Sequence, residues 1–385
     1  MDYDVVVIGA GIQGAGVSQA AAAAGYRTLL LEQYDRPAAA TSSKSSKLIH
    51  GGLRYLESGQ IRLVRECLAE RKRLLANAPH LVRLTPFHIP VYQNTRRRPW
   101  QIRLGLSLYA LLGGKGFQQV PRSAWPDLDG LGNESLDAVF RYYDAQTDDA
   151  KLTQAVLASA GSLGAEARFR CSFERAVCER EHCTVFYRGK DAGSEIKTRA
   201  LINAAGPWVN TVLERIEPVV SPLAIDLVQG THLVIPGTLQ QGIYYLEAPQ
   251  DQRAVFVMPW KNNILLGTTE SLFTGNPEDV QPLEQEISYL LDVYNHYFKK
   301  ALDSSQVIEA FAGLRVLPKH KDAAFHRSRD TLLHRDAASC PRLLSIYGGK
   351  LTSYRATAEK VIQQLAPLLP SRKKLADTRT LQLPE

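Results

Sequence analysis

The feature that most limits the fold of this chain is a glycine-rich turn between an apolar run and an alanine-rich run. Residues 3–8 read YDVVVI, residues 9–14 read GAGIQG, and beyond the alanine-rich run residues 28–31 read TLLL. Apolar runs of this length bounded by turn formers predict buried strands, and the segment between them has the length of a helix. The sequence therefore predicts a strand, turn, helix and strand in that order, the unit of a parallel sheet covered by helices.

The glycine spacing within that turn is typical of a dinucleotide-binding site. Gly9 permits the tight turn, Gly11 lets the backbone approach a pyrophosphate, and Gly14 allows the helix to pack closely on the strand. The amides that begin the helix favour the phosphates. Glu32 ends the second strand, and its carboxylate can bind ribose hydroxyls but repels a 2′-phosphate. The site therefore favours FAD or NAD over NADP.

A second polar segment follows at residues 41–56, which read TSSKSSKLIHGGLRYL. Its hydroxyls, glycines and basic side chains are suited to hydrogen bonds with a polar cofactor. On composition alone, an ordinary solvated loop explains the segment equally well. Only the wider sequence decides between these two interpretations.

Residues 41–57 closely resemble the signature of the FAD-dependent glycerol-3-phosphate dehydrogenases, a family of the glycine/D-amino-acid oxidase-like flavoproteins. The resemblance continues in RLVRECLAER, LLANAPHLV, LINAAGPWVN, VQGTHLVIP, AVFVMPWKNNILLGTTE, FAGLRVLP and SIYGGKLTSYRATAE. Glu270 stands where the family more often has aspartate, and GLRVLP replaces the commoner GVRPL. The chain stops soon after the last of these segments, whereas many family members carry a further helical C-terminal domain.

The resemblance implies an α/β fold, α+β overall, in which a Rossmann-type FAD-binding domain is interleaved with a substrate-binding domain built on a mixed or antiparallel sheet. The predicted bounds are 1–75, 145–215 and 335–370 for the FAD-binding domain, 76–144 and 216–334 for the substrate-binding domain, and 371–385 for a C-terminal tail. Residue patterns alone predict strands of one antiparallel sheet at 223–236, 242–246, 254–259 and 263–268, and helices at 61–76 and 283–300.

The resemblance also assigns residues to FAD, which in this family lies against the glycine turn, the polar loop and two later returns of the chain. The predicted cofactor-binding residues are Gly9, Gly11, Ile12, Gln13, Gly14, Glu32, Gln33, Thr41, Ser42, Ser43, Ser46, Lys47, Leu48, His50, Gly51, Ala205, Gly206, Trp208, Gly349, Lys350, Leu351 and Thr352. His50 is predicted to contact the flavin, and whether it forms a covalent link is left open. We predict no metal site.

A phosphorylated substrate calls for convergent cations, because a phosphomonoester dianion is best held by several donors and arginine offers a planar two-point grip. By resemblance, the predicted substrate-binding residues are Arg54, Tyr55, His232, Thr268, Arg315, Arg329 and Lys350. A basic residue taken singly is more often a solvated surface charge. The prediction therefore depends on these residues meeting at one place.

The reaction that the resemblance implies is oxidation of sn-glycerol 3-phosphate to dihydroxyacetone phosphate. A hydride would pass from C2 to flavin N5, and the electrons would go on to membrane quinone. His232 and Arg315 are predicted to be catalytic, with His232 as the base whose pKa neighbouring cations would depress. A strand histidine bonded to a backbone carbonyl is the other interpretation of His232. For the whole chain, the alternatives are oxidation of a 2-hydroxy acid or amino acid, and a non-catalytic flavin-binding protein at a membrane.

An apolar stretch at residues 102–112 follows three arginines within the segment 96–115. It is far shorter than the ~20 residues that a spanning helix needs. Side chains at Trp100, Leu104, Leu108 and Leu111 recur at helical spacing, which predicts either a helix at a membrane surface or a core helix with a basic cap. The first interpretation predicts peripheral contact with the inner face of the cytoplasmic membrane.

Composition adds limits of a general kind. A formal charge of +7 and a pI near 9.1 favour anionic partners, but the basic residues are dispersed and match no nucleic-acid motif. The five cysteines are an odd number and contain no CxxC pair, so they indicate neither a disulfide framework nor a zinc site. We therefore expect a reducing compartment. No secretory leader precedes the first strand, so we expect a cytoplasmic protein.

Overall fold

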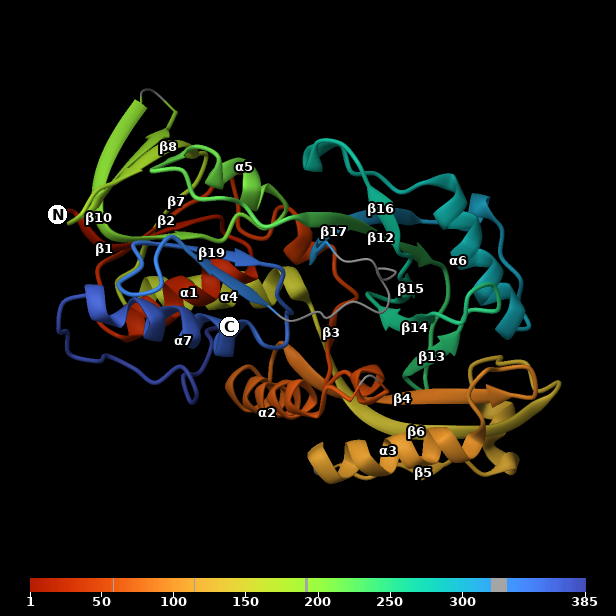
Figure 1. Ribbon diagram of the computed structural model, residues 1–385. Helices are drawn as coiled ribbons and strands as arrows, with labels where there is room; N and C mark the ends of the chain where they lie inside the picture. The colour runs from red at the N-terminus through yellow and green to blue at the C-terminus, as the bar shows by residue number, and fades with distance from the viewer. Residues whose placement is uncertain (58, 114, 191–192, 320–330) are drawn as a thin grey trace.

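A computed structural model describes residues 1–57, 59–113, 115–190, 193–319 and 331–385. Two sheets dominate the described chain, and Figure 1 shows them side by side, the first with both termini near it and the second flanked by α6. The chain passes between the sheets repeatedly: β1, β2, β7–β11, β18 and β19 belong to the first, and β3–β6 and β12–β17 to the second. The α/β fold with interleaved halves is therefore confirmed, and the exact domain bounds stay a prediction.

The first sheet carries the predicted strand–turn–helix–strand unit. Its strands are β1 (Tyr3–Ile8), β2 (Thr28–Leu31), β7 (Glu166–Arg168), β8 (Ser172–Cys178), β9 (Cys183–Arg188), β10 (Gly193–Asn203), β11 (Ile216–Glu217), β18 (Leu332–Arg335) and β19 (Leu343–Tyr347). In its central part β7, β2, β1, β10 and β19 run parallel. Three helices cover one face, namely α1 (Ile12–Ala23), α4 (Asp149–Ser162) and α7 (Tyr354–Leu365). The short helix α5 (Val209–Leu213) follows β10.

The second sheet forms the other half of the molecule. Its strands are β3 (Leu48–Ile49), β4 (Val82–Tyr92), β5 (Gln118–Gln119), β6 (Leu136–Thr147), β12 (Ile225–Ile235), β13 (Ile243–Glu247), β14 (Ala254–Trp260), β15 (Asn263–Gly267), β16 (Ser271–Phe273) and β17 (Glu309–Pro318). Its flanking helices are α2 (Ile61–Asn77), α3 (Pro99–Gly113) and α6 (Glu284–Tyr297). The four predicted strands and two predicted helices are present within a few residues. The sheet is mixed because β13 pairs with β4 in parallel.

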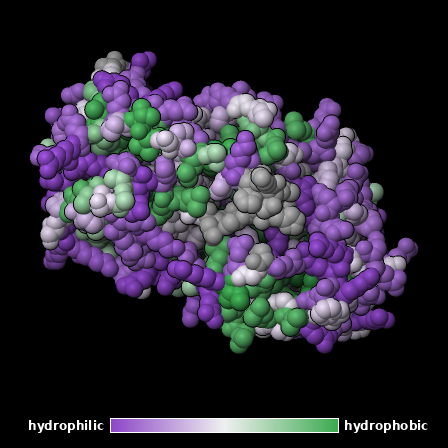
Figure 2. Space-filling model, in the orientation of Figure 1, coloured by the Kyte–Doolittle hydropathy of each residue, from purple (hydrophilic) through white to green (hydrophobic). Residues whose placement is uncertain are grey.

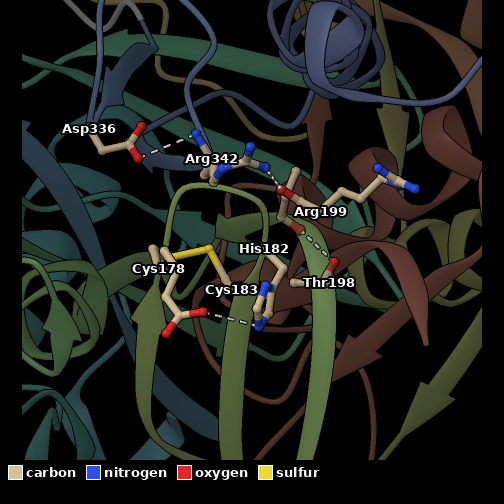
Figure 3. Close-up of a disulfide and its surroundings, with 9 residues drawn as sticks. Cys178, His182, Cys183, Thr198, Arg199, Asp336 and Arg342 are labelled. Atoms are coloured by element: carbon tan, nitrogen blue, oxygen red, sulfur yellow. Dashed lines mark hydrogen bonds and ion pairs between the residues drawn. A yellow bond between two sulfur atoms is a disulfide. The ribbon is translucent and has the colours of Figure 1, made fainter. Parts of the chain in front are cut away.

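One prediction from the cysteines is wrong. Cys178 and Cys183 form a disulfide between β8 and β9, as Figure 3 shows. The turn between the strands brings the two residues directly opposite each other, because the amide of Glu179 donates to the carbonyl of His182. This pairing follows from strand register and not from a spacing motif, which is why counting cysteines missed it. The inference of a reducing compartment consequently loses its support.

The last fifteen residues, 371–385, contain no helix or strand but are held to the first half of the molecule. The amide of Leu375 donates to the carbonyl of Ala23, and that of Leu383 to the carbonyl of Asn77. The Leu383 side chain is buried. The predicted tail is thus a packed segment.

Candidate active site

The glycine turn is held by backbone contacts that leave no room for side chains. Gly9 has a φ of +99°, and a Cβ there would lie 2.8 Å from the carbonyl oxygen of Ala204. A Cβ on Gly14 would lie 1.8 Å from the carbonyl oxygen of Gly9, so helix and turn touch through bare backbone. The turn therefore requires glycine at both positions, for the reasons that the sequence indicates.

The acidic end of β2 lies where a ribose would be expected. Glu32 is buried, and its carboxylate accepts hydrogen bonds from the amides of Ala10 at 2.5 Å and Tyr34 at 3.0 Å. Burial raises the pKa of Glu32, while these amides act in the opposite direction. The side chain lines a cavity beyond the glycine turn that also contains the predicted residues Gly9, Gly11, Gln33, Thr41, Ser42, Ala205, Gly206 and Trp208.

A second cavity continues from the first, sharing Gly11, Thr41, Ser42 and Gly206 with it, and lies between the two sheets. Its lining includes the predicted cofactor residues Ile12, Gln13, Ser46, Leu48, His50, Gly349, Lys350, Leu351 and Thr352. It also includes six of the predicted substrate residues, Arg54, Tyr55, His232, Thr268, Arg315 and Lys350. The two cavities together form one cleft that is long enough to join the turn to the substrate residues.

Four predicted cofactor residues do not line this cleft. Gly14 packs inside α1, and Gly51 and Ser43 lie behind the wall. Lys47 is buried in an ion pair with Asp149, with Nζ 2.6 Å from the carboxylate, which also accepts hydrogen bonds from Ser45. This buried ion pair fixes the conformation of the polar loop at residues 41–56. Lys47 therefore supports the site without lining the cleft. The seventh predicted substrate residue, Arg329, lies outside the described residues.

His232 lies on β12 with 2% of its surface exposed and faces the cleft. Its Nε2 is 2.9 Å from Ser46 Oγ, and its ring stacks on Phe311 with centroids 5.2 Å apart. Burial, together with the charges of Lys47 and Arg315, lowers the pKa of His232 to about 3. The imidazole is therefore neutral near pH 7 and able to accept a proton. The alternative of a ring bonded to a backbone carbonyl finds no support, because Nδ1 has no hydrogen-bond partner among the described residues.

Cationic side chains also line the cavity that His232 lines. Arg315 on β17 donates from Nη2 to the carbonyl oxygen of Thr269 at 3.1 Å, and its Nη1 lies 3.2 Å from the carboxylate of Glu270. Lys350 lines the same cavity, and its Nζ lies 4.5 Å from the centre of the Tyr55 ring. The ammonium is buried and lacks a hydrogen-bond partner within the described chain. Such a cation is poised to take an anionic ligand.

The sequence prediction missed several cleft residues. Arg253 reaches the cleft from β13–β14 and donates to the carbonyl oxygen of Glu270 at 3.1 Å. Asp144 is fully buried in the wall, bound to Arg71 and to the hydroxyl of Tyr109 at 2.6 Å. Neither carries a local signal, since each reaches the site through strand pairing. Glu270 could have been found, because it stood out as a departure within a family motif.

The cleft fits FAD on the evidence of its own atoms. The turn has no room for a Cβ at Gly9, and Ser42 Oγ accepts the hydrogen bond of the Ile12 amide at 2.9 Å, so a hydroxyl marks the start of α1. Gln13 Oε1 and Lys350 Nζ are buried in the wall without partners in the described part of the chain. A flavin dinucleotide carries both hydrogen-bond donors and acceptors, so it can supply a donor to Gln13 Oε1 and an acceptor to Lys350 Nζ. The residues present therefore match a flavin dinucleotide.

Comparison with known proteins agrees with this site. The sequence model of the family described as FAD dependent oxidoreductase matches residues 4–355. A glycerol-3-phosphate dehydrogenase of Pseudomonas aeruginosa is 40% identical, with 95% of this chain and 72% of that protein covered. A D-erythritol 1-phosphate dehydrogenase of Brucella abortus is 37% identical, with 95% and 74% covered. A solved glycerol-3-phosphate dehydrogenase from Bacillus halodurans, in complex with FAD, has a TM-score of 0.76 at 26% identity, covering 100% of this chain and 68% of that one.

The fold and the cleft define an FAD-dependent oxidoreductase, an enzyme of the glycine/D-amino-acid oxidase-like superfamily. Within it, the similarity extends over nearly the whole chain at 37–40% identity. The chain belongs to the FAD-dependent glycerol-3-phosphate dehydrogenase family. The predicted family and cofactor are thus confirmed.

Proposed function

We propose that this enzyme oxidises sn-glycerol 3-phosphate to dihydroxyacetone phosphate and passes the electrons to a membrane quinone. The observation that carries the proposal is that Arg54, Arg315, Lys350 and one neutral buried histidine, His232, line the same cavity between the two sheets. Bound FAD supplies the two-electron acceptor for the substrate. The protein has to hold the phosphate, orient C2 and take one proton.

The phosphate is held by cations that line the cleft in this proposal. Arg315 offers a planar guanidinium, and Lys350 a buried ammonium that lacks a hydrogen-bond partner among described residues. Charge-assisted bonds from such groups to a dianion are the strong kind, and arginine can make two at once. A substrate without the phosphate would leave the buried Lys350 ammonium without an anion to bind, so the site should reject plain glycerol.

His232 is the proposed base. Its pKa of about 3 is low for this task, and the first cause is burial, followed by the charges of Lys47 and Arg315. A bound dianion beside Arg315 would offset that positive charge and raise the pKa toward the operating range. Ser46, 2.9 Å from Nε2, is able to orient the ring. Proton abstraction would therefore be favoured only when the substrate is in place.

The direct test is anaerobic addition of glycerol 3-phosphate to the purified flavoprotein while the oxidised-flavin absorption is followed. We expect rapid bleaching with this substrate, none with glycerol, and loss of bleaching in Arg315→Ala. Arg188→Ala is the control. Arg188 is exposed on β9, forms an ion pair with Glu174 and does not line the cleft. An unchanged spectrum with glycerol 3-phosphate would overturn the substrate assignment.

D-erythritol 1-phosphate is a second candidate substrate, favoured by the Brucella abortus relative of that name. The same cations would hold its phosphate, so only the length of the hydroxyl chain separates the two compounds. A panel of glycerol 3-phosphate, D-erythritol 1-phosphate, 2-hydroxy acids and amino acids ranks them. We expect the phosphate esters to exceed the carboxylates by at least tenfold in kcat/KM, about 1.4 kcal/mol.

The quinone and membrane part of the proposal is supported by α3. Trp100, Leu104 and Leu111 are 66%, 64% and 82% exposed, and Leu108 is 36% exposed, so the predicted stripe faces outward. Figure 2 shows a hydrophobic patch at the lower edge of the molecule, where α3 lies in Figure 1. None of the described helices is both long and apolar enough to cross a bilayer. We propose that α3 lies in the interface of the inner face of the cytoplasmic membrane.

Sedimentation with lipid vesicles tests that contact. Binding to vesicles that contain anionic lipid should fall at least about tenfold in the double variant Leu104→Gln, Leu111→Gln, because two exposed apolar side chains leave the interface. Val219→Gln is the matched control, since Val219 is 85% exposed but belongs to another surface. Equal binding by the two proteins would exclude α3 as the anchor.

A further inference from the structure

A buried carboxylate lies behind the substrate end of the cleft. Glu286 belongs to the first turn of α6 and is 4% exposed. Its Oε2 accepts hydrogen bonds from Gln229 Nε2 and Thr231 Oγ1, both at 2.6 Å. Its Oε1 accepts from Thr269 Oγ1 at 2.8 Å and Ser271 Oγ at 2.9 Å. Four side chains of two separate segments therefore end on one carboxylate.

The two segments are those that carry the proposed chemistry. Thr231 precedes His232 on β12, and Thr269 lies between Thr268 and Glu270, which line the cleft. The amide of Thr231 also donates to Thr269 Oγ1 at 2.8 Å, which ties the segments to each other. Glu286 itself does not line either cavity. Any influence that it has on the substrate is therefore indirect.

Thr269 in turn contacts Arg315, the proposed phosphate-binding residue. The carbonyl oxygen of Thr269 accepts from Arg315 Nη2 at 3.1 Å, and the neighbouring Glu270 carboxylate lies 3.2 Å from Arg315 Nη1. Both contacts depend on the path of the backbone at residues 268–271. Because that path is fixed from behind by Glu286, the guanidinium of Arg315 is aimed by a residue that it does not touch.

The protonation state of Glu286 determines which groups donate and which accept in these hydrogen bonds. Burial would raise the pKa of Glu286, but the hydrogen bonds from Thr231, Thr269, Gln229 and Ser271 outweigh it and lower the pKa. An ionised carboxylate accepts only, so the three hydroxyls must all point their hydrogens at it. Thr269 Oγ1 is then left with a lone pair for the Thr231 amide. A buried charge of this kind persists only with such full satisfaction.

We propose that Glu286 is a positioning residue for the substrate anion, acting through Thr269 on Arg315. The inference rests on the proposed function, because the anion in question is the phosphate of glycerol 3-phosphate. It adds a residue from α6 that no sequence motif marks and that contributes no atom to the cleft. Its effect should appear in substrate affinity more than in flavin content.

Glu286→Gln tests the proposal, since glutamine keeps the shape but replaces one acceptor oxygen by an amide NH2 group, which donates and cannot accept from the threonine and serine hydroxyls. We expect the dissociation constant for glycerol 3-phosphate, from anaerobic flavin reduction, to rise about tenfold, with flavin content close to that of the control. The control is Glu284→Gln, which removes an exposed carboxylate from the same helical turn.

A double-mutant cycle separates positioning from general damage. Because Arg315→Ala is not expected to be reduced by glycerol 3-phosphate, all four proteins of the cycle are titrated with inorganic phosphate and followed by perturbation of the oxidised-flavin spectrum. In the Arg315→Ala background, Glu286→Gln should change this dissociation constant less than about twofold, because the group on which it acts is gone. An equal tenfold change with and without Arg315 would overturn the proposal, as would a Glu286→Gln enzyme that binds substrate like Glu284→Gln. If Glu286→Gln does not fold, Thr269→Val, which removes the intermediate hydroxyl, carries the same cycle.

Failure of the proposed function would look different. Wild-type enzyme that glycerol 3-phosphate does not reduce would remove the substrate assignment. Titration of the same variants with inorganic phosphate, followed by perturbation of the flavin spectrum, would then still test the link between Glu286 and Arg315. A dissociation constant for phosphate that is equal in Glu286→Gln and Glu284→Gln would overturn that link.

Discussion

The two ends of the cleft are built in different ways. At the cofactor end, Gly9 and Gly14 contact each other within one turn, and the nearest foreign backbone is that of Ala204, which directly follows the adjacent strand β10. At the substrate end, His232 comes from β12, Arg315 from β17 and Thr269 from the segment between β15 and β16. These parts of the chain meet through the register of β12 with β15, β16 and β17. The first end tolerates no added atom, whereas the second depends on side chains aimed by long-range pairing.

Adding bulk at the cofactor end should have the largest effect. Gly14→Val places carbon atoms where the Gly9 carbonyl lies, since even a Cβ would be 1.8 Å from that oxygen. The turn must open, and we expect purified protein without bound flavin, measured by the visible spectrum. Gly161→Ala is the control, because a Cβ at this position in α4 meets no atom within 4 Å. Flavin retained at wild-type occupancy in Gly14→Val would show that the turn is not the binding element.

Removing the proposed base should break the substrate end alone. His232→Asn is expected to lower the limiting rate of flavin reduction by about 100-fold or more, the usual contribution of a positioned general base. Flavin content should stay unchanged, because His232 is not among the residues that line the cavity beyond the glycine turn. His296→Asn, an exposed histidine of α6, serves as the reference. A rate within threefold of wild type would remove His232 from the mechanism.

A second buried histidine sharpens the comparison. His88 on β4 is fully buried, and burial followed by the charge of Arg141 lowers its pKa to about 4. As the pH falls, His88 takes up its proton in the unfolded chain at a higher pH than in the folded protein. The contribution of neutral His88 to the free energy of unfolding is therefore complete above pH ~6.5 and is lost as the pH falls toward 4. His88→Leu should therefore reduce the acid-induced loss of unfolding free energy over this range by up to about 3 kcal/mol.

The rate of flavin reduction shows whether His88→Leu disturbs the active site. His88 does not line either cavity, so His88→Leu should leave flavin reduction within twofold of wild type. Denaturant unfolding at pH 7 and pH 4.5, with His296→Asn beside it, measures the stability part. The same pH dependence in wild type and His88→Leu would assign the acid sensitivity to other groups.

The smallest effect is expected at the disulfide. Replacing Cys178 and Cys183 by serine opens a short loop across one hairpin, and the chain-entropy account gives about 2 kcal/mol for a loop of this size. Melting temperature should fall by a few degrees, while flavin content and reduction are unchanged because Cys178 and Cys183 do not line the cleft. A change in the reduction rate would reveal a link between hairpin and cleft that the contacts do not indicate.

The sequence predicted the position of a residue correctly where that position depends on neighbours along the chain. Gly9 and Glu32 could be assigned from spacing alone, and His232 and Arg315 from family motifs, and the structure brings all four to one cleft. Lys47 looked like a cofactor residue by its place in the polar loop. It turns away because Asp149, more than a hundred residues later, offers it a buried partner.

The sequence by itself determined the strand–turn–helix unit, the preference for a flavin or nicotinamide dinucleotide and the family, because each depends on residues that are neighbours along the chain. The exposure of the α3 stripe, the cysteine pair and the roles of Arg253 and Glu286 were decided only by tertiary structure. Apolar periodicity is the same on a buried and an exposed helix face, and a hydrogen bond between distant segments leaves no local pattern. Strand register, which no short window of sequence contains, set those contacts.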